Sequence, residues 1–90
     1  MKLKYNFVIN EVAGSTVAVA VGEDAAKFKG FLKMNSTGAE IFRMLKNEVS
    51  KEALVENLSQ IYPEQEKEIL VKSVESFVSE LLEAEVLEQC

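Results

Sequence analysis

The hydrophobic period of the chain changes abruptly at one place, the stretch Asn35-Ser36-Thr37-Gly38. Before this stretch, apolar residues alternate with polar ones, which is the pattern of strands with one buried face. After it, apolar residues recur at every third or fourth position, which is the pattern of amphipathic helices. The sequence therefore predicts an α+β fold in which a small sheet is followed directly by helices.

Three segments have the pattern of strands, namely residues 5–12, 15–21 and 28–34. Ala13-Gly14 stands between the first two, and Gly14-Ser15 suits a tight hairpin turn because glycine takes positive φ without steric cost. Three consecutive strands joined in this way form an antiparallel three-stranded sheet. The first and third strands are then expected at its edges.

The first helix is expected to follow the third strand with almost no connection. Its apolar face is made of Gly38, Ile41, Phe42, Leu45 and Val49. Its start can be capped by Asn35, by Ser36, or by Thr37 in a capping box with Glu40. The sequence does not choose among these three caps.

Two further helices are expected, one from near Ser50 to Pro63 and one from there to about Glu83. The third helix has two apolar stripes, made of Leu70, Val74, Phe77 and Leu81, and of Val71, Val78 and Leu82. One stripe can pack on the other helices. The second needs a cover, which the sheet, the C-terminal segment, a second copy or a bound ligand could supply.

Length and composition exclude several classes of protein. The 90 residues, 1–90, are expected to form a single domain. The net charge is −5, which disfavours nucleic acid as a partner, and no apolar run approaches the ~20 residues that span a membrane. The one cysteine, Cys90, allows no internal disulfide and favours a cytoplasmic location.

The chain lacks the residues that catalysis and metal binding most often use. It has no histidine and one aspartate, and its four glycines form no phosphate-binding loop. We therefore expect no catalytic residues, no metal site and no cofactor, and the protein is not expected to be an enzyme.

Three stretches resemble the PqqD-like family over nearly the whole chain. "FLKMNSTGAEIFRML" resembles its strand-to-helix junction, "SKEALVENLSQIYP" its second helix, and "VESFVSELLEAEVLE" its third helix. The resemblance implies a three-stranded sheet followed by three helices, related to winged helix-turn-helix proteins. It also implies a partner: the leader segment of a ribosomally made precursor peptide, which such proteins bind and hand to a modifying enzyme, often a radical S-adenosylmethionine enzyme.

In that family the leader docks as an added strand at the edge of strand three and lies against helix three. The residues that this assigns to peptide binding in strand three are Lys29, Gly30, Phe31, Leu32, Lys33 and Met34. The second stripe of helix three, Val71, Val78 and Leu82, is the expected floor of the groove. The two lysines of the strand, Lys29 and Lys33, either pair with leader carboxylates or guard an exposed edge against aggregation.

Two other functions remain open at this level. A winged-helix protein that binds DNA has the same implied fold, although the acidic start of the third helix argues against it. A small homodimeric structural module would bury the second apolar stripe against its own copy.

Overall fold

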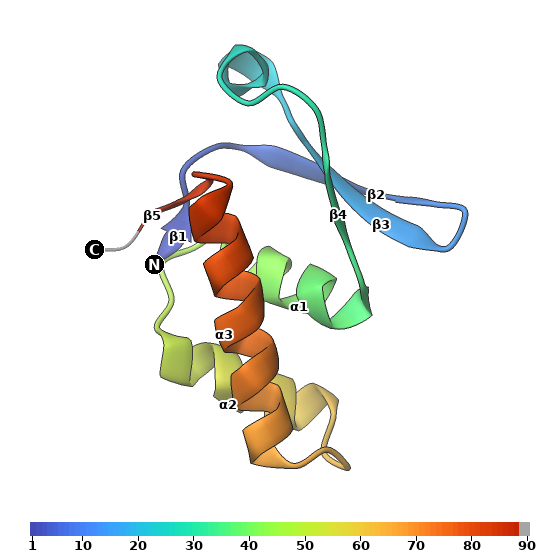
Figure 1. Cartoon of the computed structure of the whole chain (residues 1–90), viewed down its shortest axis with the longest axis vertical. Helices are drawn as coiled ribbons and strands as arrows, with labels where there is room; N and C mark the ends of the chain where they lie inside the picture. Colours follow the sequence, from blue (N-terminus) through green and yellow to red (C-terminus); the bar gives the residue numbers. More distant parts are fainter. Residues whose placement is uncertain (89–90) are drawn as a thin grey trace.

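The computed structural model describes residues 1–88, and for Val12 the description covers the backbone only. Cys90 therefore lies outside the described residues. In chain order the elements are β1 (Lys2–Leu3), β2 (Phe7–Val12), β3 (Ser15–Ala20), the 3-10 helix η1 (Gly22–Ala26), β4 (Leu32–Met34), α1 (Ser36–Met44), α2 (Lys51–Ile61), α3 (Lys67–Glu83) and β5 (Leu87–Glu88). The sheet β2-β3-β4 lies at one end of the long axis and α2 at the other, with α1 between them (Figure 1). The expected α+β fold is confirmed.

The sheet begins with a hairpin, β2 and β3, whose turn consists of two residues. Ala13 and Gly14 have φ of 50° and 80°, and the register pairs Val12 with Ser15 across the turn. Two consecutive residues with positive φ form the type I′ turn, whose twist matches that of the flanking strands. The hairpin therefore lies where the sequence predicts it.

The third strand is shorter than the sequence predicts. The strand expected over residues 28–34 exists only as β4, because Gly30 has φ of 100° and interrupts the extended backbone. Phe28 packs into the core instead, with its ring centroid 5.7 Å from that of Phe7. Lys29, Gly30 and Phe31 therefore precede β4, and Phe31 is 64% exposed.

The abrupt change from strand to helix is made by one side chain. The Gly38 N–H donates to Asn35 Oδ1 at 2.8 Å, so Asn35 is the N-cap of α1, one of the three caps that the sequence leaves open. Val49 lies beyond the end of α1, contrary to the prediction. Ser50 caps α2, accepting a hydrogen bond from the Ala53 N–H at 3.1 Å.

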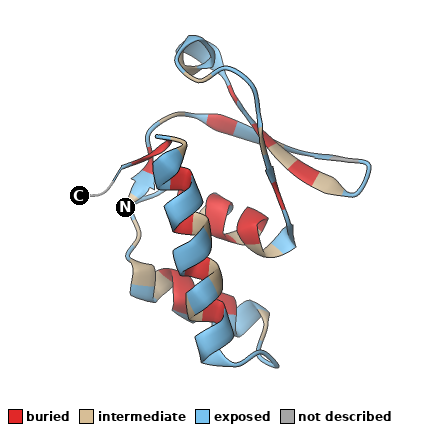
Figure 2. Cartoon of the chain, in the orientation of Figure 1, coloured by how far each residue is buried: buried red, intermediate tan, exposed pale blue. Residues whose placement is uncertain are grey.

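Aromatic rings connect the sheet, α1 and α3. The Phe42 side chain is completely buried, and its ring centroid lies 5.2 Å from that of Phe7 and 6.5 Å from that of Phe77. Both contacts are edge-to-face, the arrangement that aromatic pairs prefer. Figure 2 shows α1 buried along most of its length between the sheet and the other helices. The core therefore centres on α1.

A small second sheet joins the two ends of the described chain. β1 and β5 are antiparallel, with Leu3 opposite Leu87. The Leu3 N–H also donates to the Leu45 carbonyl at 3.0 Å, and the Lys4 N–H donates to the Val86 carbonyl at 2.8 Å. The sequence does not predict this sheet, because two-residue strands are too short to show a period.

Gly38 allows α3 to approach α1 closely. A Cβ atom at this position would lie 2.9 Å from Phe77 Cε1 and 3.2 Å from Asn35 Oδ1. The first distance is shorter than atoms in contact tolerate, so the Phe77 ring rests on the backbone of α1. This contact sets the separation of the two helices near the start of α1.

The end of α3 has the hydrogen bonds of a Schellman motif. The Val86 N–H donates to the Leu81 carbonyl at 3.2 Å, and the Glu85 N–H donates to the Leu82 carbonyl at 3.1 Å. Glu85 has φ of 60°, the left-handed conformation that glycine usually supplies at this position. The motif turns the chain from α3 into β5.

We predict that Gly38→Ala lowers the free energy of unfolding by about 1–3 kcal/mol, because the added methyl overpacks the contact with Phe77. At an exposed helix position the same change would stabilise by roughly 1 kcal/mol. In a Phe77→Leu background the clash is removed, and Gly38→Ala should become neutral or stabilising. Urea unfolding of the four proteins measures this coupling, and additive effects of the two substitutions would contradict the contact.

We also predict that Glu85→Gly raises the free energy of unfolding by about 1 kcal/mol, because glycine adopts positive φ without the strain of a side chain. The matched control is Glu83→Gly, two residues earlier in the last turn of α3, which should destabilise by up to about 1 kcal/mol. Thermal unfolding of both variants tests the prediction. A lower midpoint for Glu85→Gly would overturn it.

Candidate functional site

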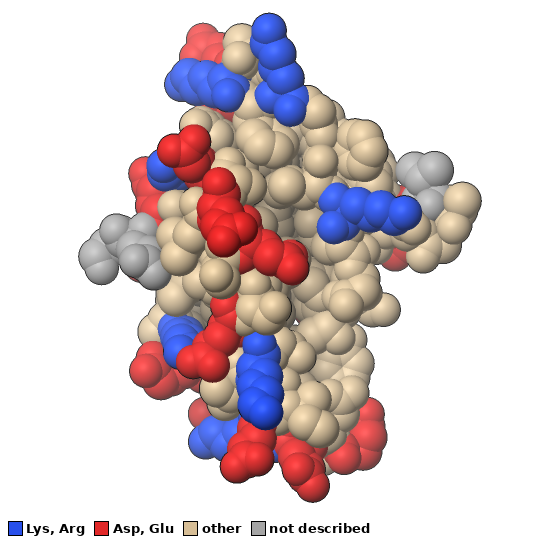
Figure 3. All heavy atoms as spheres, in the orientation of Figure 1, with Lys and Arg blue, Asp and Glu red and all other residues tan. Residues whose placement is uncertain are grey.

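A groove of about 570 Å³ lies between β4, the first turn of α1 and α3. Its lining includes apolar residues, small polar groups from α3 and charged residues, namely Lys33, Met34, Asn35, Thr37, Gly38, Ile41, Ile69, Lys72, Ser73, Ser76, Phe77 and Glu80. Figure 3 shows acidic side chains gathered over α3 and a strip of uncharged atoms beside them, over the space between α3 and β4. The groove is long and open, the shape that an extended chain fills.

The hydrogen-bonding pattern of β3 follows from the hairpin. In a two-residue hairpin the flanking residues, here Val12 and Ser15, exchange backbone hydrogen bonds. Alternation along β3 then directs the amides of the odd-numbered residues toward β2. The Val21 N–H, which donates to the Asn6 carbonyl at 3.0 Å, agrees with this alternation.

The even-numbered residues of β3 therefore bond β4. Thr16 pairs with Met34 and Ala18 with Leu32, so these pairs hold the two strands together. The backbone N–H and C=O of Lys33, between them, point away from β3. No other strand within residues 1–88 pairs with this edge of β4. One donor and one acceptor of Lys33 thus face the groove side of the sheet.

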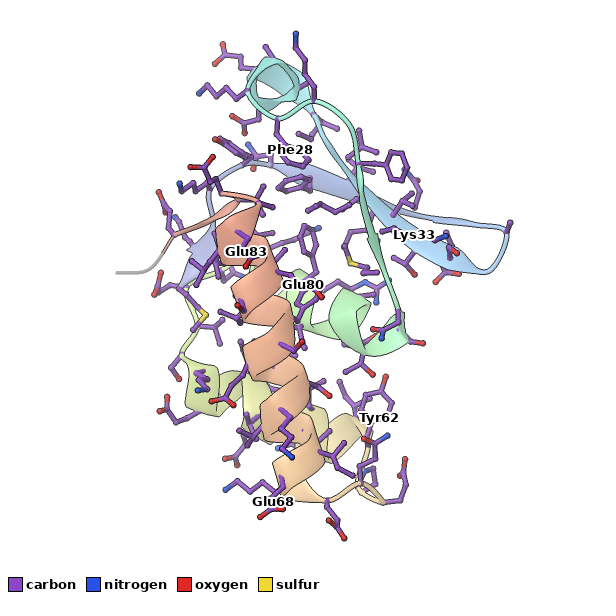
Figure 4. All side chains as sticks on the ribbon, in the orientation of Figure 1. Phe28, Lys33, Tyr62, Glu68, Glu80 and Glu83 are labelled. Atoms are coloured by element: carbon purple, nitrogen blue, oxygen red, sulfur yellow. The ribbon has the colours of Figure 1, made fainter. Side chains whose placement is uncertain are left out.

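One side of α3 faces the groove. Ile69, Ser73, Phe77 and Glu80 follow each other at intervals of three or four residues, which brings them to the same side of a helix. Figure 4 shows Glu80 projecting from α3 toward β4, whereas Lys33 lies on the far side of β4 from α3. The side of α3 that lines the groove is therefore half apolar, with Ile69 and Phe77, and half polar, with Ser73 and Glu80.

The stripe expected to form the groove floor lies on the other side of α3. Val78 is buried in the core with 8% of its surface exposed, and Val71 borders a separate hollow between α2 and α3. Leu82 is 37% exposed and lies about 140° around the helix from Phe77. None of these three residues lines the groove beside β4.

Of the six strand residues expected to bind peptide, two border the groove, Lys33 and Met34. Leu32 faces the core side of the sheet, and the residues before β4 do not reach the groove. Sequence reasoning missed Ile69 and Ser73, since a search for apolar stripes passes over a face that contains serines. A possible signal was Ile69, the large apolar residue of that face that lies outside both stripes.

Charges along α3 differ between the two ends of the groove. Lys72 lies toward the N-terminal end of α3 and Glu80 toward its C-terminal end. Neither makes an ion pair with any residue in the described part of the chain. Both charges are therefore available to a bound molecule.

Two other features are absent from residues 1–88. No group of three or more acidic, histidine or cysteine side chains is arranged to hold a metal ion there. None of the helices in the same residues has the length and apolar character required to cross a membrane.

Comparisons with known proteins agree with this fold. No curated protein matched the chain in sequence. A solved structure of TbiB1 in complex with the TbiA(beta) leader peptide superposes with a TM-score of 0.73 and 17% identity, covering 100% of this chain and 98% of that one. At this identity the likeness shows the fold. The family model of coenzyme PQQ synthesis protein D (PqqD) matches residues 16–87, and the chain therefore belongs to the PqqD family.

Proposed function

We propose that this protein binds the leader segment of a ribosomally made precursor peptide as an added strand on β4 and presents it to a modifying enzyme. Membership of the PqqD family and the fold shared with TbiB1, solved with a leader peptide, support the proposal. The observation that carries it is the edge of β4, where the outward amide and carbonyl of Lys33 lie beside an open groove. An extended peptide can satisfy both groups.

Side chains must supply most of the affinity. β4 is only three residues long, and Lys33 is its one residue whose backbone groups point outward, so the strand offers two hydrogen bonds. At about 0.5–1.5 kcal/mol each they contribute little of the roughly 8 kcal/mol that micromolar binding requires. Two or three apolar leader side chains packed against the exposed Ile69 and the half-buried Phe77 would add about 1.5–3 kcal/mol each. Specificity then resides in the groove.

Delivery to an enzyme is the second part of the proposal. The family is described by its role in the synthesis of a coenzyme, which supports a place beside biosynthetic enzymes. We propose a modifying enzyme, with the radical S-adenosylmethionine type as the first candidate, and no catalytic step on this chain. The exposed Val8 and Val19 of the sheet, and the exposed Phe31 just before β4, do not line the groove.

The alternatives have less support. Acidic side chains gather over α3 on the face seen in Figure 3, and the net charge of the chain is −5, which together disfavour a phosphate backbone. A homodimer through the second stripe of α3 is also disfavoured, because Val78 is already buried by its own chain and only Leu82 of that stripe is exposed.

The proposal predicts that Lys33→Pro weakens binding of the leader peptide at least tenfold. Proline removes the outward N–H and prevents an added strand from pairing there, whereas the bonds from β3 to β4 remain. The measurement is the Kd of a labelled synthetic leader from a precursor peptide encoded beside this gene, with circular dichroism as the check that the fold is kept.

Two controls separate the backbone from the side chain. Lys33→Thr removes the charge but keeps the N–H and should bind within a few-fold of the parent. Leu32→Pro removes a bond between β3 and β4 and should lower the free energy of unfolding. A Lys33→Pro variant that folds and binds with an unchanged Kd would exclude strand addition at β4.

A further inference from the structure

We propose that the groove selects the order of charges in its peptide, taking an extended segment in which an acidic side chain precedes a basic one by about four residues. This inference rests on the proposed function and adds to it the direction and charge pattern of the ligand. It is carried by the unlike charges at the two ends of the groove, Lys72 and Glu80.

The spacing of the two charges fixes the spacing in the peptide. Lys72 and Glu80 are eight residues apart on α3, which is about 12 Å along a helix axis. A strand advances about 3.3 Å per residue, so the same distance corresponds to roughly four residues of an extended peptide. Side chains four apart in a strand point to the same face, so both can face α3.

The orientation of β4 fixes the order. Figure 1 shows that β4 descends toward the start of α1 while α3 ascends, so the two run in opposite directions. Both existing pairings of this sheet are antiparallel, and a guest strand antiparallel to β4 would run parallel to α3. The N-terminal end of the guest then lies near Lys72 and the C-terminal end near Glu80.

Neighbouring charges do not cancel the difference in charge between the two ends of the groove. Glu75, one turn after Lys72, is paired with Lys51 of α2, and Glu68, one turn before it, makes no ion pair with Lys72. Lys33 lies on the far side of β4 from α3 and does not compensate Glu80 (Figure 4). The dipole of α3, positive at its N-terminus, has the same sense as the two side chains.

Two capped ten-residue peptides of identical composition test the proposal. In the acid-first peptide Glu precedes Lys by four positions around a central Leu, with Val and Thr elsewhere, and in the base-first peptide Glu and Lys are exchanged. Acetylated and amidated ends remove the terminal charges. NMR titration of the intact protein to millimolar peptide should give about five- to tenfold tighter binding of the acid-first peptide, as two partly exposed ion pairs allow.

Matched variants identify the charges responsible. Lys72→Glu combined with Glu80→Lys should reverse the preference. Lys67→Glu combined with Glu83→Lys changes the same charges on the same helix at two positions that do not line the groove, and should keep the preference of the parent. Raising the salt to 1 M should abolish the difference between the peptides in the parent, because salt screens exposed charges.

The outcomes separate this inference from the proposed function. Equal binding of both peptides, or tighter binding of the base-first one, overturns the inference and leaves strand addition standing. The inference is also overturned if Lys67→Glu with Glu83→Lys reverses the peptide preference and Lys72→Glu with Glu80→Lys does not. Failure of both peptides to bind at millimolar concentration also overturns the inference, because the charge pattern is then not enough for binding, whereas the proposed function is decided by the encoded leader and Lys33→Pro.

Discussion

The complete burial of the Phe42 ring holds the sheet and the helices in one arrangement. Phe7 approaches it from the sheet and Phe77 from α3, both edge-to-face. Each ring buries a large apolar surface, and the edge-to-face geometry fixes the mutual orientation of its neighbours as well as their distance. Gly38 completes the arrangement, because the absence of a side chain lets Phe77 rest on the first turn of α1. The position of α3 relative to β4 follows from these contacts.

The groove exists because two elements are held side by side without touching along their length. Asn35 ends β4 and starts α1 within one residue, so the sheet cannot fold down onto α3. The half-buried Phe77 closes the bottom of the space, and the serines at 73 and 76 leave its side open. The same short strand that keeps the edge free also limits the number of backbone hydrogen bonds that a guest can make. Under the proposed function, a guest peptide would therefore gain more from side-chain contacts than from backbone hydrogen bonds.

Much of the fold was predictable from the sequence, because its elements have strong periods. The switch at Asn35 locates the boundary between sheet and helices, and Ser50 and Pro63 bracket α2. The bounds of β4 were not predictable in this way, since Gly30 continues the alternation of the sequence while its φ of 100° ends the strand. The pairing of β1 with β5 joins residues that no local pattern connects.

The candidate site was predicted less well than the fold, for a physical reason. Which face of a helix lines a groove depends on what lies opposite, and this is decided by tertiary packing. Val71 and Val78 pack against the core, and Leu82 is exposed away from the groove, whereas the groove side of α3 carries serines and charges suited to a wet surface. A search for apolar stripes finds the first kind of face and passes over the second.

The pairing of β1 with β5 has a consequence for the order of events during synthesis. Leu3 is made more than eighty residues before its strand partner Leu87. Until then the hairpin and α1 can form from local contacts, while β1 lacks its strand partner. The pairing of β1 is thus among the last native contacts to be completed, although β1 is made before every other element of the fold.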